Sequence, residues 1–160
     1  LCRIVHRWRK RQIEHKEFEG DTCIRIVFIL KTDILPKDAK KENKSVYRVI
    51  KFGTIDRNGF IGTYEEIQRG LIPPKKRMNL DDPGLYSTSC NMKYSEAEYA
   101  LNMFMRHYPK PFIAKGETEG SCGPCQLTSE REKRSDTHVD WWIYEDTEPQ
   151  IYFSEVSNSE

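Results

Sequence analysis

The sequence of 160 residues predicts an α+β fold. Three observations lead to this class: predicted strands dominate the C-terminal half, helices and strands do not alternate regularly, and aromatic residues make up 11% of the chain, too many for a disordered protein. A chain of this length typically forms one domain, because domains have roughly 100–200 residues. We expect a single domain over 1–160, with an N-terminal strand and basic connector over 1–44 and the core over 45–156.

Apolar and β-branched residues predict two strands in the first third of the chain. Thr22–Leu30 has the composition of a buried strand, and Ser45–Phe52 is the next one. Between them, Lys31–Lys44 is rich in Lys and contains a proline, which predicts a loop. Gly53–Gly62 carries turn residues and separates the second strand from the first helix.

Two capping-box patterns predict helices. Thr63 is placed to cap a short helix, with Glu66 three residues later and Gly70 as its stop. Ser95 and Glu98 form the second box, at the start of a longer helix with one buried stripe that ends at a proline. The stripe consists of Ala97, Ala100, Leu101, Phe104, Met105 and Tyr108.

Four further strands and one long loop complete the predicted order. The strands are Gly84–Ser89, Pro111–Lys115, Thr137–Tyr144 and Gln150–Val156, and Gly116–Asp136 is the polar loop. The chain has neither a GxGxxG nor a P-loop sequence. A nucleotide would therefore be bound in another way.

Charge is unevenly distributed although the formal net charge is only +1. Residues 1–16 carry a net +5 and residues 145–160 a net −5. The basic stretch is typical either of a phosphate or RNA contact or of a solvated surface, and we favour the second. No apolar run approaches the roughly 18 residues of a membrane helix, so no membrane segment is expected.

The five cysteines do not imply a disulfide framework, because their number is odd. Cys122-Gly-Pro-Cys125 has the spacing of half a zinc site or of a redox pair. No second pair with suitable spacing follows it. We favour a structural turn, which makes zinc unexpected, with a zinc-stabilised domain as the alternative.

Three features carry residues suited to chemistry. Arg48 interrupts an apolar strand, so its guanidinium must form an ion pair, face solvent at an edge, or reach a cleft, where its donors suit a phosphate or a ribose hydroxyl. The hydroxyls of Ser87-Thr88-Ser89 can bond a neighbouring strand or hold a catalytic carboxylate. Glu148 and Gln150 would share one face of a strand, where they could bind a ribose hydroxyl or form a solvated edge.

The order of these features, with a helix after the hydroxyls, resembles the ADP-ribosyltransferase superfamily over about 45–156. The cholera-type toxin branch, which carries an Arg, a Ser-Thr-Ser and a Glu-x-Glu, is the most similar. The resemblance implies a split β-sandwich with short flanking helices and an NAD cleft between two sheets. Gln150 stands where the toxins carry their catalytic glutamate, a difference compatible with NAD hydrolysis or with a weak or dead enzyme.

The poly-ADP-ribose polymerase branch is an alternative. Gly84-Leu85-Tyr86 and Ser95–Tyr99 are similar to its nicotinamide-stacking segment, and Asp140 lies near the position of its glutamate. Arg48 replaces the histidine of that branch.

The resemblance implies a role for each candidate residue. Glu148 would accept a hydrogen bond from the ribose 2′-hydroxyl as the oxocarbenium-like transition state forms, with Gln150 beside it and Asp140 in reserve. Ser87 would orient the carboxylate. Arg48 would bind the diphosphate or the adenine-side ribose. The other expected NAD-binding residues are Tyr86, Thr88, Ser89 and Tyr99, with both tyrosines placed to stack on nicotinamide.

The implied activity is that of an NAD-consuming ADP-ribosyltransferase or NAD glycohydrolase. Its partners would be NAD and a macromolecular acceptor, either protein or nucleic acid. The toxin likeness favours a secreted or injected effector, with a cytoplasmic protein as the alternative. A non-enzymatic module that binds nucleic acid or protein remains the competing hypothesis.

Overall fold

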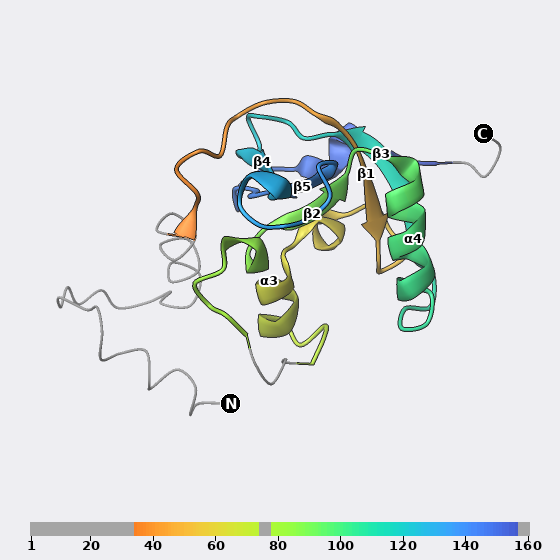
Figure 1. The fold of residues 1–160 in the computed structure, drawn as a ribbon. Helices are drawn as coiled ribbons and strands as arrows, with labels where there is room; N and C mark the ends of the chain where they lie inside the picture. Colours follow the sequence, from red (N-terminus) through yellow and green to blue (C-terminus); the bar gives the residue numbers. More distant parts are fainter. Residues whose placement is uncertain (1–33, 74–77, 157–160) are drawn as a thin grey trace.

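Six strands form one antiparallel sheet in the computed structural model, which describes residues 34–73 and 78–156 (Figure 1). The strand order across the sheet is β4-β5-β2-β1-β3-β6. The strands are β1 (Ser45–Ile50), β2 (Thr88–Asn91), β3 (Phe112–Glu117), β4 (Cys125–Leu127), β5 (His138–Trp141) and β6 (Phe153–Glu155). With its helices, this sheet confirms the predicted α+β class. The strand expected at Thr22–Leu30 lies outside the described residues.

The helices are α3 (Thr63–Gln68) and α4 (Tyr94–Phe104). Short 3-10 helices mark four of the connections: η1 (Arg57–Phe60), η2 (Pro83–Leu85), η3 (Thr128–Glu130) and η4 (Pro149–Tyr152). Figure 1 shows α4 alongside β1 and β3. Within the described residues, no helix has the length and apolar character needed to cross a membrane.

The sheet is nearly divided between β1 and β2. β1 pairs with β3 at six positions, from Ser45↔Glu117 to Ile50↔Phe112, and β2 pairs with β5 at four. By contrast, β1 and β2 are in register at one position only, Tyr47↔Asn91. The described strands thus belong to one sheet, but its two halves, β4-β5-β2 and β1-β3-β6, are joined by a short contact.

The two faces of β1 bury different cores. Val46 and Ile50 belong to the larger core, whereas Val49 points to the opposite face, because side chains alternate along a strand. The larger core contains Val46, Ile50, Phe60, Cys90, Ala114, Cys122, Cys125, Val139, Trp141, Ile143 and Phe153. On the other face, Ala97 of α4 packs with Val49 and Ile113. This second core holds α4 against the sheet.

Both capping-box predictions are wrong in detail, although both helices exist. Gly62 precedes α3 without a side-chain cap, and Glu66 instead bonds Lys51 with both carboxylate oxygens, at 2.7 and 2.9 Å. Lys93 precedes α4, again without a side-chain cap, so Ser95 already lies inside the helix. Glu66 therefore forms an ion pair with Lys51 and not the predicted capping contact at the start of α3.

Three predicted segments differ from the observed ones. The strand expected at Gly84–Ser89 begins only at Thr88, because Asp82 caps η2 by accepting a hydrogen bond from the Gly84 amide. The loop expected at Gly116–Asp136 contains β4, whose three residues pair with β5. The segment expected to be a strand from Gln150 starts as η4 and becomes β6 only at Phe153.

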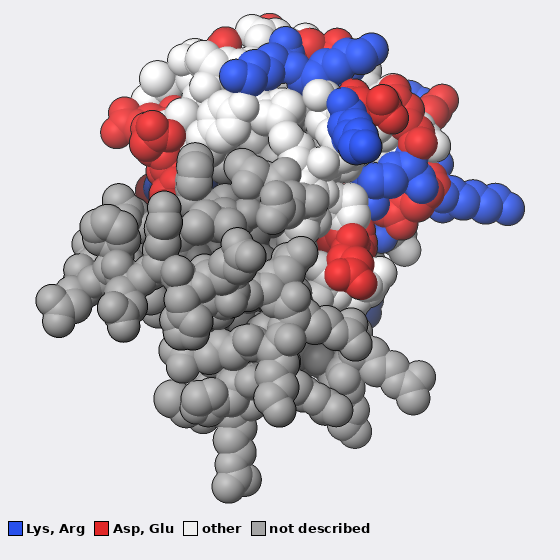
Figure 2. Space-filling model, turned by 90° about the vertical axis from the view of Figure 1, so that its left-hand side faces the viewer, with Lys and Arg blue, Asp and Glu red and all other residues white. Residues whose placement is uncertain are grey.

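Charges of both signs occur together on one face. Figure 2 shows Lys and Arg side chains in the upper and right-hand parts of this view, with Asp and Glu among them. The basic stretch over 1–16 lies outside the described residues, so the structure does not bear on its role.

Candidate functional site

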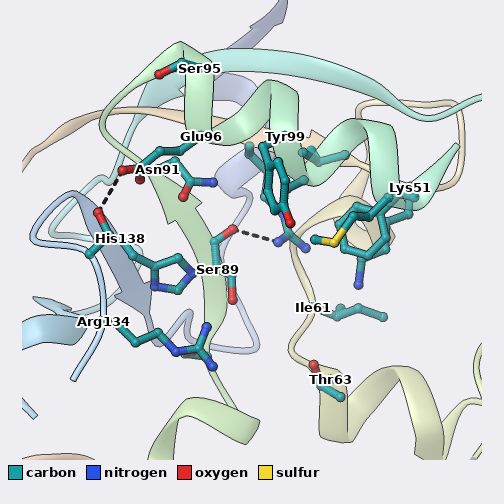
Figure 3. Close-up of a pocket in the computed structure, with 17 residues that line it drawn as sticks. Lys51, Ile61, Thr63, Ser89, Asn91, Ser95, Glu96, Tyr99, Arg134 and His138 are labelled. Atoms are coloured by element: carbon teal, nitrogen blue, oxygen red, sulfur yellow. Dashed lines mark hydrogen bonds between the residues drawn. The ribbon is translucent and has the colours of Figure 1, made fainter. Parts of the chain in front are cut away.

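A cleft of about 510 Å³ lies between α4 and the strands β1, β2 and β5 (Figure 3). Its volume is within the range of roughly 300–1,000 Å³ usual for small-molecule sites. One wall consists of α4 residues spaced by helical turns: Glu96, Tyr99 and Met103. The opposite wall consists of sheet residues such as Ser89 and His138. The cleft therefore opens beside the division between β1 and β2.

Arg48 lies at the base of the cleft and is only 5% exposed. Its Nε donates to the Gly59 carbonyl at 3.0 Å, and its Nη1 donates to the Ser89 carbonyl at 2.7 Å. The sequence left an ion pair, a solvent-facing edge and a cleft position open for this residue. The structure places the guanidinium in the cleft, where it bonds backbone carbonyls of two neighbouring segments.

The three consecutive hydroxyls point to different places. The Ser89 side chain is exposed in the cleft, and Ser87 also lines it. Thr88 is buried and donates to the Phe60 carbonyl. Alternation along β2 explains the difference, because Thr88 faces the larger core and its neighbours face the cleft side. Ser87 and Ser89 thus share the cleft with Arg48, and Thr88 does not.

Asp140 is buried beneath the cleft and does not line it. Its Oδ1 lies 2.6 Å from the Ser87 hydroxyl, and its Oδ2 accepts from Thr128 at 2.9 Å. The Arg131 guanidinium forms an ion pair with the same Oδ2. Ser87 therefore donates to the carboxylate of Asp140 on β5 and not to that of Glu148, the first candidate that the resemblance implied.

Glu96 supplies the only carboxylate among the cleft-lining side chains of the described residues. Ser135 donates to its Oε1 at 2.7 Å, and Thr137 donates to its Oε2. The hydrogen bond from Thr137, together with that from Ser135, holds the pKa of Glu96 below its ordinary value, against the opposing effect of burial. The group is therefore an ionised acceptor at neutral pH.

His138 projects into the cleft from β5, beside Ser89 (Figure 3). Its Nδ1 lies 2.6 Å from the Thr128 hydroxyl oxygen. Burial lowers the pKa of His138, partly opposed by the carboxylate of Asp140. The imidazole is therefore neutral at neutral pH.

The two tyrosines expected to stack on nicotinamide lie in different environments. Tyr86 is buried outside the cleft, with its ring 4.8 Å from that of Tyr64 and its hydroxyl bonded to the Leu80 carbonyl. Burial raises the pKa of Tyr86 to about 12. Tyr99 lines the cleft and is 69% exposed. Tyr99 alone of the pair has a ring face open to a ligand in this cleft.

Glu148 and Gln150 do not line the cleft. Glu148 is exposed and precedes η4, and Gln150 lies within that 3-10 helix. The expectation that both side chains share one face of a strand is therefore wrong, because the backbone here is not extended. Gln150 Oε1 is buried and has no hydrogen-bond partner among the described residues.

The Cys122-Gly-Pro-Cys125 segment forms a structural turn. Cys122 and Cys125 are free thiols buried in the larger core. Gly123 has φ +149°, and a Cβ at this position would lie 1.9 Å from the Trp142 carbonyl oxygen, so the turn requires glycine. Among residues 34–73 and 78–156, no group of three or more His, Cys, Asp or Glu side chains is placed to hold a metal ion.

Comparisons of the chain with models of protein families, with curated proteins and with solved structures found no match. Sequence reasoning identified Arg48, Ser87, Ser89 and Tyr99 but missed Glu96 and His138. The spacing of Glu96 from Tyr99 by nearly one helical turn was the available signal, since it places both on one helix face.

Proposed function

We propose that the cleft binds NAD and that the protein cleaves its nicotinamide–ribose bond, as an NAD glycohydrolase or an ADP-ribosyltransferase. One observation carries this proposal: Arg48 and Ser89, from the motifs that resemble ADP-ribosyltransferases, share a cleft with the ionised Glu96 and the exposed ring of Tyr99. A cationic group, a carboxylate and an aromatic ring match the three chemical parts of NAD: diphosphate, ribose and planar base.

The cationic groups suit the diphosphate. The Nε and one Nη1 proton of Arg48 bond backbone carbonyls, and a guanidinium has five N–H donors, so further donors remain for an anion. Arg134 also lines the cleft, and more than half of its side chain is exposed. Figure 3 shows the Arg134 guanidinium below His138, on the side of the cleft opposite α4. An anionic ligand would therefore meet positive charge at the base and at the rim.

The carboxylate suits the reacting ribose. Loss of nicotinamide builds positive charge on the sugar, and a fixed acceptor against the 2′-hydroxyl stabilises that charge. We assign this role to Glu96 in place of Glu148, because Glu96 lines the cleft and its two oxygens are fixed by Ser135 and Thr137. Asp140 contributes indirectly, by holding Ser87.

Tyr99 provides a stacking surface for one planar base. Its exposed ring lies on α4, one turn beyond Glu96, and therefore close to the proposed ribose position. An aromatic side chain can stack on any planar base, because every base has a π-face.

The narrow contact between β1 and β2 is consistent with the split β-sandwich that the resemblance to ADP-ribosyltransferases implies. A split sandwich needs two half-sheets with a ligand cleft at their division. We infer that β4-β5-β2 and β1-β3-β6 correspond to these halves. This inference supports the ADP-ribosyltransferase likeness but is separate from the sequence motifs.

The decisive experiment is detection of free nicotinamide after incubation of the whole chain with NAD, with and without a cell lysate. Release in buffer alone indicates hydrolysis, and release that requires lysate indicates transfer to an acceptor. Glu96→Gln should reduce release on the order of a hundred- to a thousand-fold, the usual cost of losing one electrostatic contact to a transition state. The matched control is Glu98→Gln, an exposed residue of the same helix that does not line the cleft. No release by the unmodified protein under either condition would overturn the proposal.

A further inference from the structure

We infer that His138 is the general base of the cleft and that the group attacking the ribose is an O–H, either water or a hydroxyl. This inference rests on the proposed function, since it concerns the second reactant of the same reaction. It is carried by a chain of three side chains, His138, Thr128 and Asp140, in which the hydroxyl of Thr128 lies between the imidazole and the carboxylate.

The position of the Thr128 proton fixes the tautomer of His138. A hydroxyl has a single proton to donate, and Asp140 Oδ2, 2.9 Å away, belongs to a carboxylate paired with the Arg131 guanidinium. An ionised carboxylate can only accept, so the Thr128 proton points to Asp140. The Thr128 oxygen must then accept from His138 Nδ1, which lies at 2.6 Å. His138 therefore carries its proton on Nδ1.

The second ring nitrogen is thereby left as a base. With Nδ1 protonated, Nε2 of a neutral imidazole holds a lone pair. Among the described residues, no hydrogen bond reaches Nε2, and Figure 3 shows the ring directed into the cleft beside Ser89. The lone pair is thus available to a molecule bound in the cleft.

The surroundings keep this imidazole neutral. Burial lowers the pKa of His138, and Arg134 from the loop before β5 acts in the same direction. Three carboxylates oppose these effects: Asp140 on β5, Glu96 on α4, and Glu132 in the loop. The pKa remains lowered, so the neutral form that can accept a proton predominates at neutral pH.

The C1′–N bond of NAD breaks, and its electron pair moves to the ring nitrogen, so nicotinamide leaves as a neutral molecule. The oxygen of water, or of an acceptor hydroxyl, forms the new bond to C1′. His138 Nε2 takes the proton from that oxygen and later releases it to solvent. A neutral O–H group must lose its proton when its oxygen attacks, so it needs a general base. For this reason we expect the attacking group to be water or a hydroxyl.

The first test is the pH dependence of nicotinamide release by the unmodified protein, His138→Gln and His107→Gln. His107 is an exposed histidine just beyond the end of α4, outside the cleft. We expect His138→Gln to lower the rate about 100-fold or more, the usual contribution of a general base, and to remove the decrease of rate on the acid side. His107→Gln should keep both the rate and the profile.

The second test reports on the imidazole without any turnover. In ¹⁵N NMR spectra of the whole chain at neutral pH, His138 should show a protonated Nδ1 and a bare Nε2. Thr128→Val removes the acceptor and should change this tautomer, whereas Thr128→Ser should preserve it. The two substitutions test whether Thr128 is a positioning residue. If its role were purely structural, its replacement would not change which nitrogen of His138 is protonated.

The outcomes separate the two proposals. If the unmodified protein releases no nicotinamide, the proposed function fails and the role of His138 in it fails as well. If the unmodified protein is active and His138→Gln is equally active, only the inference about His138 fails. A protonated Nε2 in the NMR spectra at neutral pH would also overturn it.

Discussion

The Arg48 guanidinium donates a 2.7 Å hydrogen bond to the Ser89 carbonyl oxygen, across the place where β1 and β2 have ceased to pair. One side chain thus joins the two halves of the sheet and also lines the cleft between α4 and the strands. Its Nε also donates to the Gly59 carbonyl, so the same side chain connects the 3-10 helix η1 to the two halves of the sheet. Removal of Arg48 should therefore affect both stability and ligand binding.

Arg48→Ala should lower the free energy of unfolding, because two carbonyl acceptors lose their donor at a cost of about 1–3 kcal/mol each. Arg48→Lys should lose less, since an ammonium can restore one of the bonds. Urea unfolding measures both effects. The matched control, the exposed Arg106→Ala, should change stability by no more than about 0.5 kcal/mol. Equal stability of Arg48→Ala and the unmodified protein would contradict the connecting role.

Glu66→Gln should be among the most destabilising single changes. Lys51 Nζ bonds both oxygens of Glu66, whose side chain is 1% exposed, and loss of one partner of a buried pair costs about 3–5 kcal/mol. The Lys51 ammonium also lies 5.0 Å from the centre of the Phe104 ring, so the pair helps to place α4. Thermal or urea unfolding tests this prediction, with Glu98→Gln as control. A loss below about 1 kcal/mol would contradict it.

Stability should decrease on acidification in two steps. His138 has a lowered pKa, so the unfolded chain takes up its proton first as the pH falls below about 6.5, and unfolding is favoured. Glu96 also has a lowered pKa, so its contribution is present above about pH 4.5 and is lost as the pH falls through the folded-state value. Urea unfolding at a series of pH values measures both. In His138→Gln the first step should disappear, and its persistence there would assign it to other groups.

The Cys90 thiol should resist alkylation in the folded protein. Burial raises the pKa of Cys90 to about 12, and the reactive species is the thiolate. Burial also raises the pKa values of Cys122 and Cys125. Treatment with iodoacetamide near pH 8, followed by mass spectrometry of peptides, should label these three positions only after denaturant is added. Labelling of the Cys90 peptide without denaturant would show that the larger core opens readily.

The sequence predicted those elements whose residues carry a local pattern, such as an apolar strand or a helical stripe. β1 lies within the predicted Ser45–Phe52. Most of the predicted stripe packs in the second core from α4, but Met105, beyond the end of the helix, is exposed and was wrongly included. β4 was missed because three residues are too few for a periodic pattern, and its pairing with β5 is a long-range contact. The caps failed for a related reason: Glu66 bonds Lys51, fifteen residues away, and this partner is invisible in a local pattern.

The site was predicted in part for the same physical reason. Arg48 was recognisable because its charge contrasts with the apolar residues of β1, and Ser87 and Ser89 because they belong to a run of three hydroxyl residues. Glu96 and His138 enter the cleft only through the packing of α4 and the pairing of β5 with β2. Glu148 had the expected chemistry but lies in a part of the chain that the 3-10 helix η4 keeps outside the cleft.

Gly62 lies where the chain enters α3 and comes very close to the segment before β2. A Cβ at this position would be 2.6 Å from the Tyr86 carbonyl oxygen and 2.9 Å from that of Ser87. Every other amino acid would force these two backbones apart, and Ser87 could no longer reach Asp140 with its present geometry. We therefore expect homologues that keep the contact between Ser87 and Asp140 to keep glycine at position 62. A homologue with another residue in place of Gly62 should lack the hydrogen bond between Ser87 and Asp140.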